Sequence, residues 1–92
     1  MALLDEHEIE FRLEEFEAWA YEDKSLVKEF SHKDFSSTLA FVVHVGIEAE
    51  KTNHHPDILI HSYNKAIIRI STHSEGGVTE KDFELVYKIE NI

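Results

Sequence analysis

DFSSTLAFVVHVGIEAEKTNHHP, residues 34–56, is the stretch on which the predicted fold depends. It continues for about five helical turns without a proline before Pro56. The β-branched residues between positions 39 and 47 are equally compatible with a buried strand, but the length of the pattern and its Ala-Glu-Lys ending favour a helix. We therefore predict a central helix whose apolar face consists of Leu39, Val42, Val43, Gly46 and Ala49 or Glu50.

Pro56 determines where this helix stops. Proline cannot extend a helix, and it biases the preceding residue, His55, away from helical backbone angles. The pair His54-His55 is therefore predicted at the end of the helix or in the loop that follows it.

Two further elements are predicted before the central helix. Asp5 is a possible helix cap, and residues 8–16 combine apolar positions at helical spacing with many glutamates, which predicts a short acidic amphipathic helix. Trp19 and Tyr21 on one side of residues 22–25, and alternating residues 26–30 on the other, indicate a hairpin with a short polar turn.

A second hairpin is predicted after Pro56, from Ile-rich segments 58–63 and 66–73 that flank Asn64-Lys65. Asn tolerates positive φ, so this pair is a plausible two-residue turn. The resulting register pairs Tyr63 with Ala66 and His61 with Ile68, and places His73 on one sheet face with Arg69 and Ser71.

The last helix is predicted to begin at Thr79, where Thr79 and Asp82 form a capping-box pattern after the Gly76-Gly77 turn. Its buried side is supplied by Phe83, Val86 and Ile89 or Leu85. The order α-β-β-α-β-β-α, with sequential hairpins, predicts an α+β fold in which helices cover a four-stranded antiparallel sheet.

Size and composition indicate one domain, residues 1–92. A chain of 92 residues with 42% hydrophobic content supports one modest core, so we expect self-association to bury further surface. The formal charge of −10 repels phosphate backbones and anionic lipids, so direct nucleic-acid or membrane binding is not expected. The absence of cysteine excludes disulfides and thiolate chemistry.

The N-terminal sequence MALLDEHEIE lacks the basic and apolar regions of a secretory signal, and the apolar run Leu39–Val43 is far shorter than a membrane span. We expect a cytoplasmic protein.

Histidines dominate the candidate chemistry. His54, His55 and His73 lie in short polar segments, and imidazole, with a pKa near 6.5, exchanges protons at neutral pH. Glu50 lies four residues before His54, so within one helix its carboxylate would orient or charge that imidazole. The structural alternative is a solvated surface pair of histidines.

A metal site is a third hypothesis, because a site needs three or four ligands. The candidate ligands are His54, His55, His61 and His73. No HExxH or regular His-x-His spacing is present, so we expect no metal. His44 is expected to be a hydrogen-bonded core histidine, and His7 and His32 surface residues. Gly76-Gly77 fits neither GxGxxG nor P-loop spacing and is read as a turn.

Several motifs together resemble the signature of the pterin-4a-carbinolamine dehydratases. The resemblance extends from about Leu13 to Ile89 and includes Trp19 and the start of the central helix. The motifs that carry it are Glu50-Lys51, His54-His55-Pro56, Tyr63-Asn64-Lys65, Ser71-Thr72-His73, Gly77, Thr79 and Asp82.

This resemblance implies a fold with helices on one side of the sheet and a homodimer or homotetramer. It also implies a reaction: loss of water from 4a-hydroxytetrahydropterin to give quinonoid dihydropterin in tetrahydrobiopterin recycling, without cofactor or metal. Two alternatives come with it. The first is a protein-interaction module that acts as a transcriptional cofactor, and the second is a dehydratase for another pterin, as in molybdopterin metabolism.

The resemblance also implies site residues. It assigns catalytic roles to His54, His55, His73 and Glu50, with His54 and His73 as the acid/base pair and Glu50 orienting a histidine or the ring. The implied substrate-binding residues are His55, Asn53, Thr72 and Asp82.

Overall fold

The stretch that could have been helix or strand is a helix in the computed structural model, which describes residues 2–92. Helix α2 (Phe35–Thr52) begins at Asp34, whose side chain accepts a hydrogen bond from the Ser37 backbone N–H at 2.8 Å. It ends at Asn53, which adopts the left-handed conformation common at helix C-termini. The histidine pair therefore follows the helix, as Pro56 predicts.

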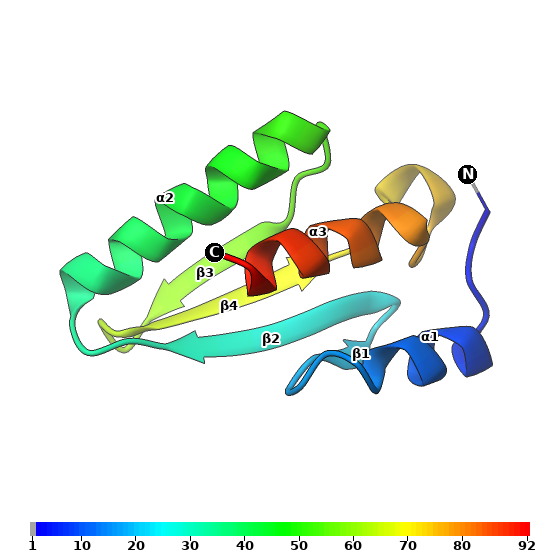
Figure 1. The fold of residues 1–92 in the computed structure, drawn as a ribbon, viewed down its shortest axis with the longest axis horizontal. Helices are drawn as coiled ribbons and strands as arrows, with labels where there is room; N and C mark the ends of the chain where they lie inside the picture. The colour runs from blue at the N-terminus through cyan, green and yellow to red at the C-terminus, as the bar shows by residue number, and fades with distance from the viewer. Residues whose placement is uncertain (1) are drawn as a thin grey trace.

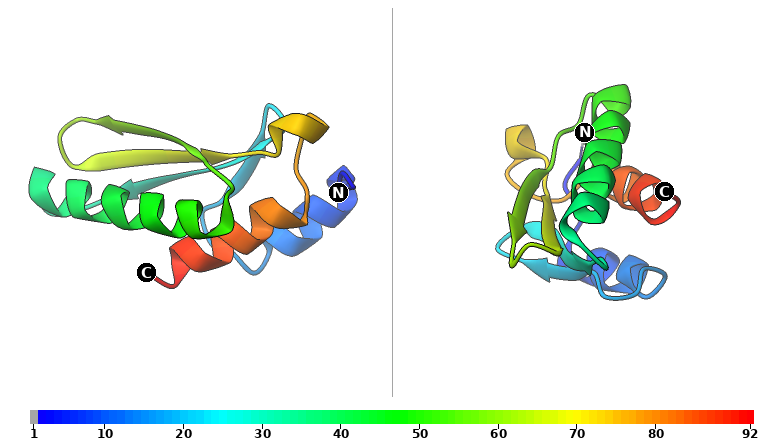
Figure 2. Two further views of the ribbon diagram at one scale, coloured as in Figure 1. Left: turned by 90° about the horizontal axis from the view of Figure 1, so that it is seen from above. Right: turned by 90° about the vertical axis from the view of Figure 1, so that its left-hand side faces the viewer.

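The strands form one antiparallel sheet of four, in the order β1-β2-β4-β3. Their bounds are β1 (Ala20–Glu22), β2 (Ser25–Ser31), β3 (Asp57–His61) and β4 (Lys65–Ile70), and the other two helices are α1 (Glu6–Leu13) and α3 (Glu80–Glu90). The predicted order and the α+β class are confirmed (Figure 1). All three helices lie on one side of the sheet in the two turned views (Figure 2).

The first hairpin turns at Asp23-Lys24, where both residues have positive φ, 47° and 62°. Two consecutive positive φ values match the twist of flanking strands, which is why such turns join hairpins. Trp19 precedes β1, and its indole N–H donates to Glu90 Oε2 at 2.8 Å. Phe16, expected on the first helix, lies beyond the end of α1.

The register predicted for the second hairpin is wrong. His61 pairs with Lys65, and Ile58 pairs with Ile68. The turn lies earlier than expected because Ser62 and Tyr63 take the positive φ values, 52° and 54°. Asn64 is held at the end of β2, where its backbone O accepts from the His32 N–H at 2.9 Å and its side chain donates to His32 O at 3.0 Å.

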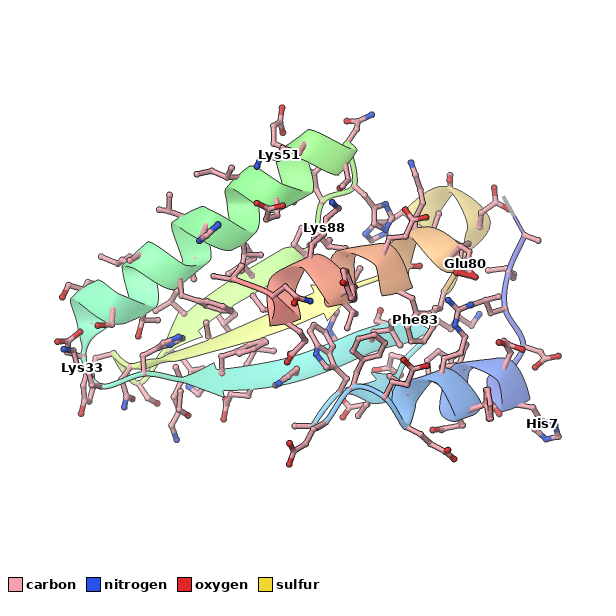
Figure 3. All side chains as sticks on the ribbon, viewed as in Figure 1. His7, Lys33, Lys51, Glu80, Phe83 and Lys88 are labelled. Carbon is pink, nitrogen blue, oxygen red and sulfur yellow. The ribbon has the colours of Figure 1, made fainter. Side chains whose placement is uncertain are left out.

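The core lies between the sheet and the helices. Alternate residues of β4, namely Ala66, Ile68 and Ile70, are buried on the helix side. Figure 3 shows Phe83 between α3 and α1, where its ring contacts Phe16 at a centroid distance of 6.2 Å. The predicted buried face of α3 is confirmed, with Phe83, Leu85, Val86 and Ile89 all buried.

The predicted buried face of α2 is correct at Ala49 but wrong at Leu39 and Val43. Thr38, Val45 and Ala49 are its buried residues, whereas Leu39 and Val43 are exposed by 40% and 61%. Small or β-branched side chains allow close packing against β4 and α3. A second stripe of large apolar residues is left uncovered in the single chain, and it comprises Phe35, Leu39, Val43 and Ile47.

No helix within residues 2–92 has the combination of length and apolarity required to cross a bilayer.

Candidate active site

Three segments meet at one end of the sheet to form a pocket of about 410 Å³. The segments are the end of α2, the turn that follows β4 and the first turn of α3, which lie together at the same end of the molecule in Figures 1 and 2. The pocket is lined by Asn53, His54, His55, Ser71, Thr72, His73, Ser74, Glu75 and Lys81. The histidines predicted from the sequence therefore come together.

His54 is held by Asp82 inside this pocket. Nε2 of His54 lies 2.6 Å from Oδ1 of Asp82, and the two residues are only 8% and 0% exposed. The other carboxylate oxygen, Oδ2, accepts from the Thr79 backbone N–H at 2.7 Å and from Thr72 Oγ1 at 2.8 Å. With Asp82 ionised, its oxygens only accept hydrogen bonds, so Nε2 of His54 carries the proton and donates it.

This contact leaves Nδ1 of His54 as the available ring nitrogen. The Nδ1 atom makes no hydrogen bond to the described residues. The only fully buried side-chain N or O atom without a partner in residues 2–92 is Nδ1 of His32, so Nδ1 of His54 is accessible from solvent. A neutral His54 with Nε2–H therefore offers a lone pair at the pocket.

Two threonines extend this arrangement. Thr72 Oγ1 donates to Asp82, and it lies 2.7 Å from Thr79 Oγ1. A hydroxyl has one proton, so Thr72 must accept from Thr79 at the second contact. The resulting order is Thr79 to Thr72 to Asp82, and both threonines are buried.

Asp82 combines this role with helix capping. Its Oδ2 contact to the Thr79 N–H completes the capping box predicted for α3. The same side chain thus fixes the start of α3 and holds His54. In the sequence, helix capping alone is enough to explain an Asp at position 82. The contact with His54 could therefore not be predicted from the capping pattern.

Glu50 contacts His55 instead of His54. Because α2 ends at Thr52, His54 leaves the helix, and the expectation that Glu50 and His54 share a helical face is wrong. Oε1 of Glu50 lies 2.8 Å from Nε2 of His55, and these side chains are 80% and 56% exposed. Glu50 is at the rim, outside the residues that line the pocket.

His73 lies in the turn after β4, not at the end of the strand. Strand β4 stops at Ile70, and His73 begins the short 3-10 helix η1 (His73–Glu75). Gly76 follows with φ 75°, and Thr72 forms an isolated bridge with Gly77. The His73 side chain is exposed, lines the pocket and makes no hydrogen bond to residues 2–92.

Comparison with known proteins identifies the family. The sequence model for the family described as pterin 4 alpha carbinolamine dehydratase matches residues 2–92. The chain belongs to this family.

Individual relatives agree with that family match. A protein of Sulfolobus acidocaldarius, whose name gives pterin-4-alpha-carbinolamine dehydratase as a provisional assignment, is 49% identical over 89 residues, 97% of each chain. A similarly named protein of Metallosphaera sedula is 38% identical over 92 residues, which is 100% of this chain and 95% of that protein.

A solved structure is also similar. The crystal structure described as a transcriptional coactivator/pterin dehydratase from Brucella melitensis has a TM-score of 0.91 and 33% sequence identity, and covers 98% of this chain and 97% of that one.

The implied substrate-binding residues of the dehydratase family occupy different environments here. Asn53 is exposed and lines the pocket, and its backbone caps α2. The polar groups of Thr72 and Asp82 are buried and hydrogen-bonded within the protein, so they position His54. Lys81 lines the pocket as well, although its position in a capping motif gave no indication of this from the sequence.

The remaining histidines lie away from the pocket or differ from their predicted environments. His61 lies at the hairpin end of β3, with Nε2 2.5 Å from Glu29 Oε2. His44 was expected in the core, but its side chain is 50% exposed and lies 3.8 Å from Glu48. The ring of His32 packs against Phe41 with a centroid distance of 4.8 Å, so it is not a fully solvated surface residue as expected. Within residues 2–92, no cluster of three or more His, Cys, Asp or Glu side chains is arranged to hold a metal ion.

Proposed function

We propose that the protein removes water from 4a-hydroxytetrahydropterin to give quinonoid dihydropterin, by acid/base catalysis with His54 and His73. The observation that carries this proposal is the His54-Asp82 contact at 2.6 Å, which leaves Nδ1 free in a pocket that His73 also lines. The pocket volume, about 410 Å³, is within the range of small-molecule sites.

The reaction requires two proton transfers. One proton is removed from N5, the N5–C4a double bond forms, the C4a–O bond breaks, and a second proton converts the leaving hydroxyl to water. No electron is gained or lost, so acid and base groups suffice. Each positioned group of this kind contributes about 10²- to 10⁴-fold to the rate.

The two histidines suit different steps. We assign the base to Nδ1 of His54, because the buried Asp82 fixes the tautomer and stabilises the imidazolium that forms when N5 loses its proton. We assign the acid to His73, which is exposed in its turn and has both ring nitrogens available. In this proposal His55, oriented by Glu50, contacts the pterin at the rim together with Asn53.

The test is the decay of chemically generated 4a-carbinolamine, followed by absorbance in the presence of the purified protein. We expect decay faster than the spontaneous rate and proportional to protein concentration. A decay rate that does not change with added protein would exclude the proposed activity.

The pathway belongs to the proposal as well. Quinonoid dihydropterin is the form that a reductase returns to tetrahydropterin, so the enzyme would act in tetrahydrobiopterin recycling after an aromatic amino-acid hydroxylase. A hydroxylase gene beside this one would support that placement. Genes for molybdopterin metabolism in its place would favour the alternative pterin.

Self-association is the second part of the proposal. The uncovered stripe on α2 repeats every four residues, and such a ridge packs into the grooves of an identical helix. We therefore propose that a second copy of the chain covers Phe35, Leu39, Val43 and Ile47. Binding of a different protein at this stripe is the alternative, and the description of the Brucella melitensis relative as a transcriptional coactivator is consistent with it.

A further inference from the structure

A second pocket of about 360 Å³ adjoins the candidate active site. Both pockets are lined by Ser71 and His73. The second pocket extends to the end of β4 at Arg69, to the start of β3 at Asp57 and to the β1-β2 turn at Asp23-Lys24. We call it the Arg69 pocket. The two pockets are therefore neighbours that share Ser71 and His73.

Arg69 lies on the side of the sheet away from the helices. Its neighbours on β4, Ile68 and Ile70, are buried against the core, and side chains alternate between the two faces of a strand. Arg69, Ser71 and His73 line one pocket together, so the prediction that they share a face holds although the strand stops at Ile70.

Arg69 makes no ion pair with any carboxylate in residues 2–92; its one side-chain hydrogen bond, Nη1 to the Glu22 carbonyl, is long at 3.4 Å. Arg12, the other arginine, makes a forked pair with Glu80. Asp57 lies directly opposite Arg69 in the β3-β4 register, yet the two side chains do not form an ion pair. Arg69 therefore lacks a carboxylate partner within residues 2–92, although the chain carries a net charge of −10.

The charges around Arg69 determine what the pocket can bind. Lys24 contributes a second cation, and Asp23 and Asp57 contribute two carboxylates. A guanidinium presents several N–H donors in a fixed fork, which matches the oxygens of a phosphate or carboxylate. The carboxylates oppose an anion, so its binding depends on direct contact with Arg69 rather than on the overall field of the protein.

We propose that the Arg69 pocket binds an oxyanion, phosphate or carboxylate, carried on the side chain of the pterin whose ring occupies the active-site pocket. This inference rests on the proposed function, because it takes the ring to be a pterin. It extends that function by naming a substrate class: pterins with an anionic side chain are preferred to pterins with a neutral one.

Stable, fully oxidised pterins provide a test that does not depend on catalysis. Binding of a dihydroxypropyl or trihydroxypropyl pterin, of its phosphate monoester and of pteroylglutamate is measured by quenching of protein or pterin fluorescence. We expect the wild-type chain to bind at least one anionic pterin about tenfold or more tightly than the neutral pterin, as one charge-assisted hydrogen bond allows. The phosphate and glutamate arms identify which oxyanion is recognised.

Three variants locate the effect. Arg69→Ala should bring the anionic pterin to the affinity of the neutral one and leave the neutral pterin within about twofold of wild type. Asp57→Asn should tighten binding of the anionic pterin, because it removes an opposing charge. Lys65→Ala is the matched control, since Lys65 lies on the same face of β4 outside the pocket and its loss changes net charge equally.

The outcomes separate this inference from the proposed function. Equal wild-type affinities for neutral and anionic pterins, or an equal loss of both in Arg69→Ala, would overturn the inference. Dehydration of a 4a-carbinolamine with a methyl side chain tests the function alone. A protein that dehydrates that substrate but shows no Arg69-dependent preference contradicts only the inference. Failure to bind any of the three oxidised pterins also overturns the inference, and the dehydration assay then decides the function separately.

Discussion

His54 follows α2, Asp82 lies in the first turn of α3, and the two side chains meet at 2.6 Å between Nε2 and Oδ1. This contact connects the C-terminal end of α2 to the N-terminal end of α3 at the pocket. Because Asp82 also caps α3, the position of His54 depends on how α3 begins.

Replacement of Asp82 by Asn tests what this contact contributes. The amide retains the shape but loses the negative charge, and it can present its NH₂ group to His54, which would favour the wrong tautomer. We expect Asp82→Asn to lower kcat by about 10²- to 10⁴-fold. The ring nitrogen chemical shifts of His54 should change from those of the Nε2–H tautomer to those of the Nδ1–H tautomer. Asp5→Asn is the control, because it changes a capping Asp on α1 outside the pocket. A kcat within twofold of wild type for Asp82→Asn would contradict the role of Asp82 in holding His54.

His55 is predicted to bind rather than to react. It is exposed, contacts Glu50 at 2.8 Å and lies at the rim of the pocket. His55→Ala should therefore raise KM by about tenfold with a smaller effect on kcat, as loss of a binding contact does. Steady-state kinetics on the pterin substrate separate the two constants. If kcat falls by 10³-fold while KM is unchanged, His55 takes part in the chemistry instead.

Thr79 is predicted to stabilise the fold as well as the site. Thr79→Val removes the side-chain cap of α3 and the buried hydrogen bond that Thr79 donates to Thr72. The expected loss is about 1–3 kcal/mol in the free energy of unfolding. Denaturant titration should show a lower midpoint with an unchanged slope. Thr79→Ser, which retains the hydroxyl, should recover most of the stability. If Thr79→Ser is as unstable as Thr79→Val, the methyl group and not the hydroxyl accounts for the loss.

Acid should weaken the contact between α1 and α3. A side-chain hydrogen bond from Arg12 lowers the pKa of Glu80 below its ordinary value, with a further lowering from the charge of Arg12 and an opposing effect of partial burial. A carboxyl whose pKa is lowered on folding contributes stability at pH above its unfolded pKa, about 4.3, and loses it as pH falls through the folded pKa.

Glu80→Gln measures this acid-sensitive contribution. The variant should be less stable than wild type at pH 7, and the difference should shrink as pH falls below about 4. Glu84→Gln, on the same helix and without an ion pair in residues 2–92, is the control. A constant difference between wild type and Glu80→Gln from pH 7 to pH 3 would contradict the assignment.

The stripe on α2 predicts the oligomeric state. Light scattering should give a mass at least twice that of the chain, 10.7 kDa. Val43→Glu, at a side chain that is 61% exposed, should shift the protein toward monomer without unfolding it. His44→Glu, one position along and off the stripe, serves as the control, and a wild-type monomer at micromolar concentration would contradict self-association.

Local signals predicted most of the fold. The predicted caps Asp5 and Thr79 begin their helices where the sequence indicates, because a capping side chain needs only its own next turn. The buried face of α2 could not be predicted in the same way. That helix has apolar residues on two sides, and which side packs inward depends on the sheet and on α3.

The same distinction applies to the site. The histidine segments were recognisable from their residues, but the pairing of His54 with Asp82 joins positions 28 apart in sequence. The pairing of Glu50 with His55 likewise depends on where α2 ends. Long-range partners depend on tertiary packing, and local spacing carries no information about them.

The most direct measurement of the central claim is the rate of 4a-carbinolamine loss with the double variant His54→Ala/His73→Ala, beside wild type and the exposed control His44→Ala. We expect the control to accelerate the reaction as wild type does, and the folded double variant to leave it near the spontaneous rate. A double variant that retains the wild-type rate would contradict the proposal that these two histidines transfer the protons.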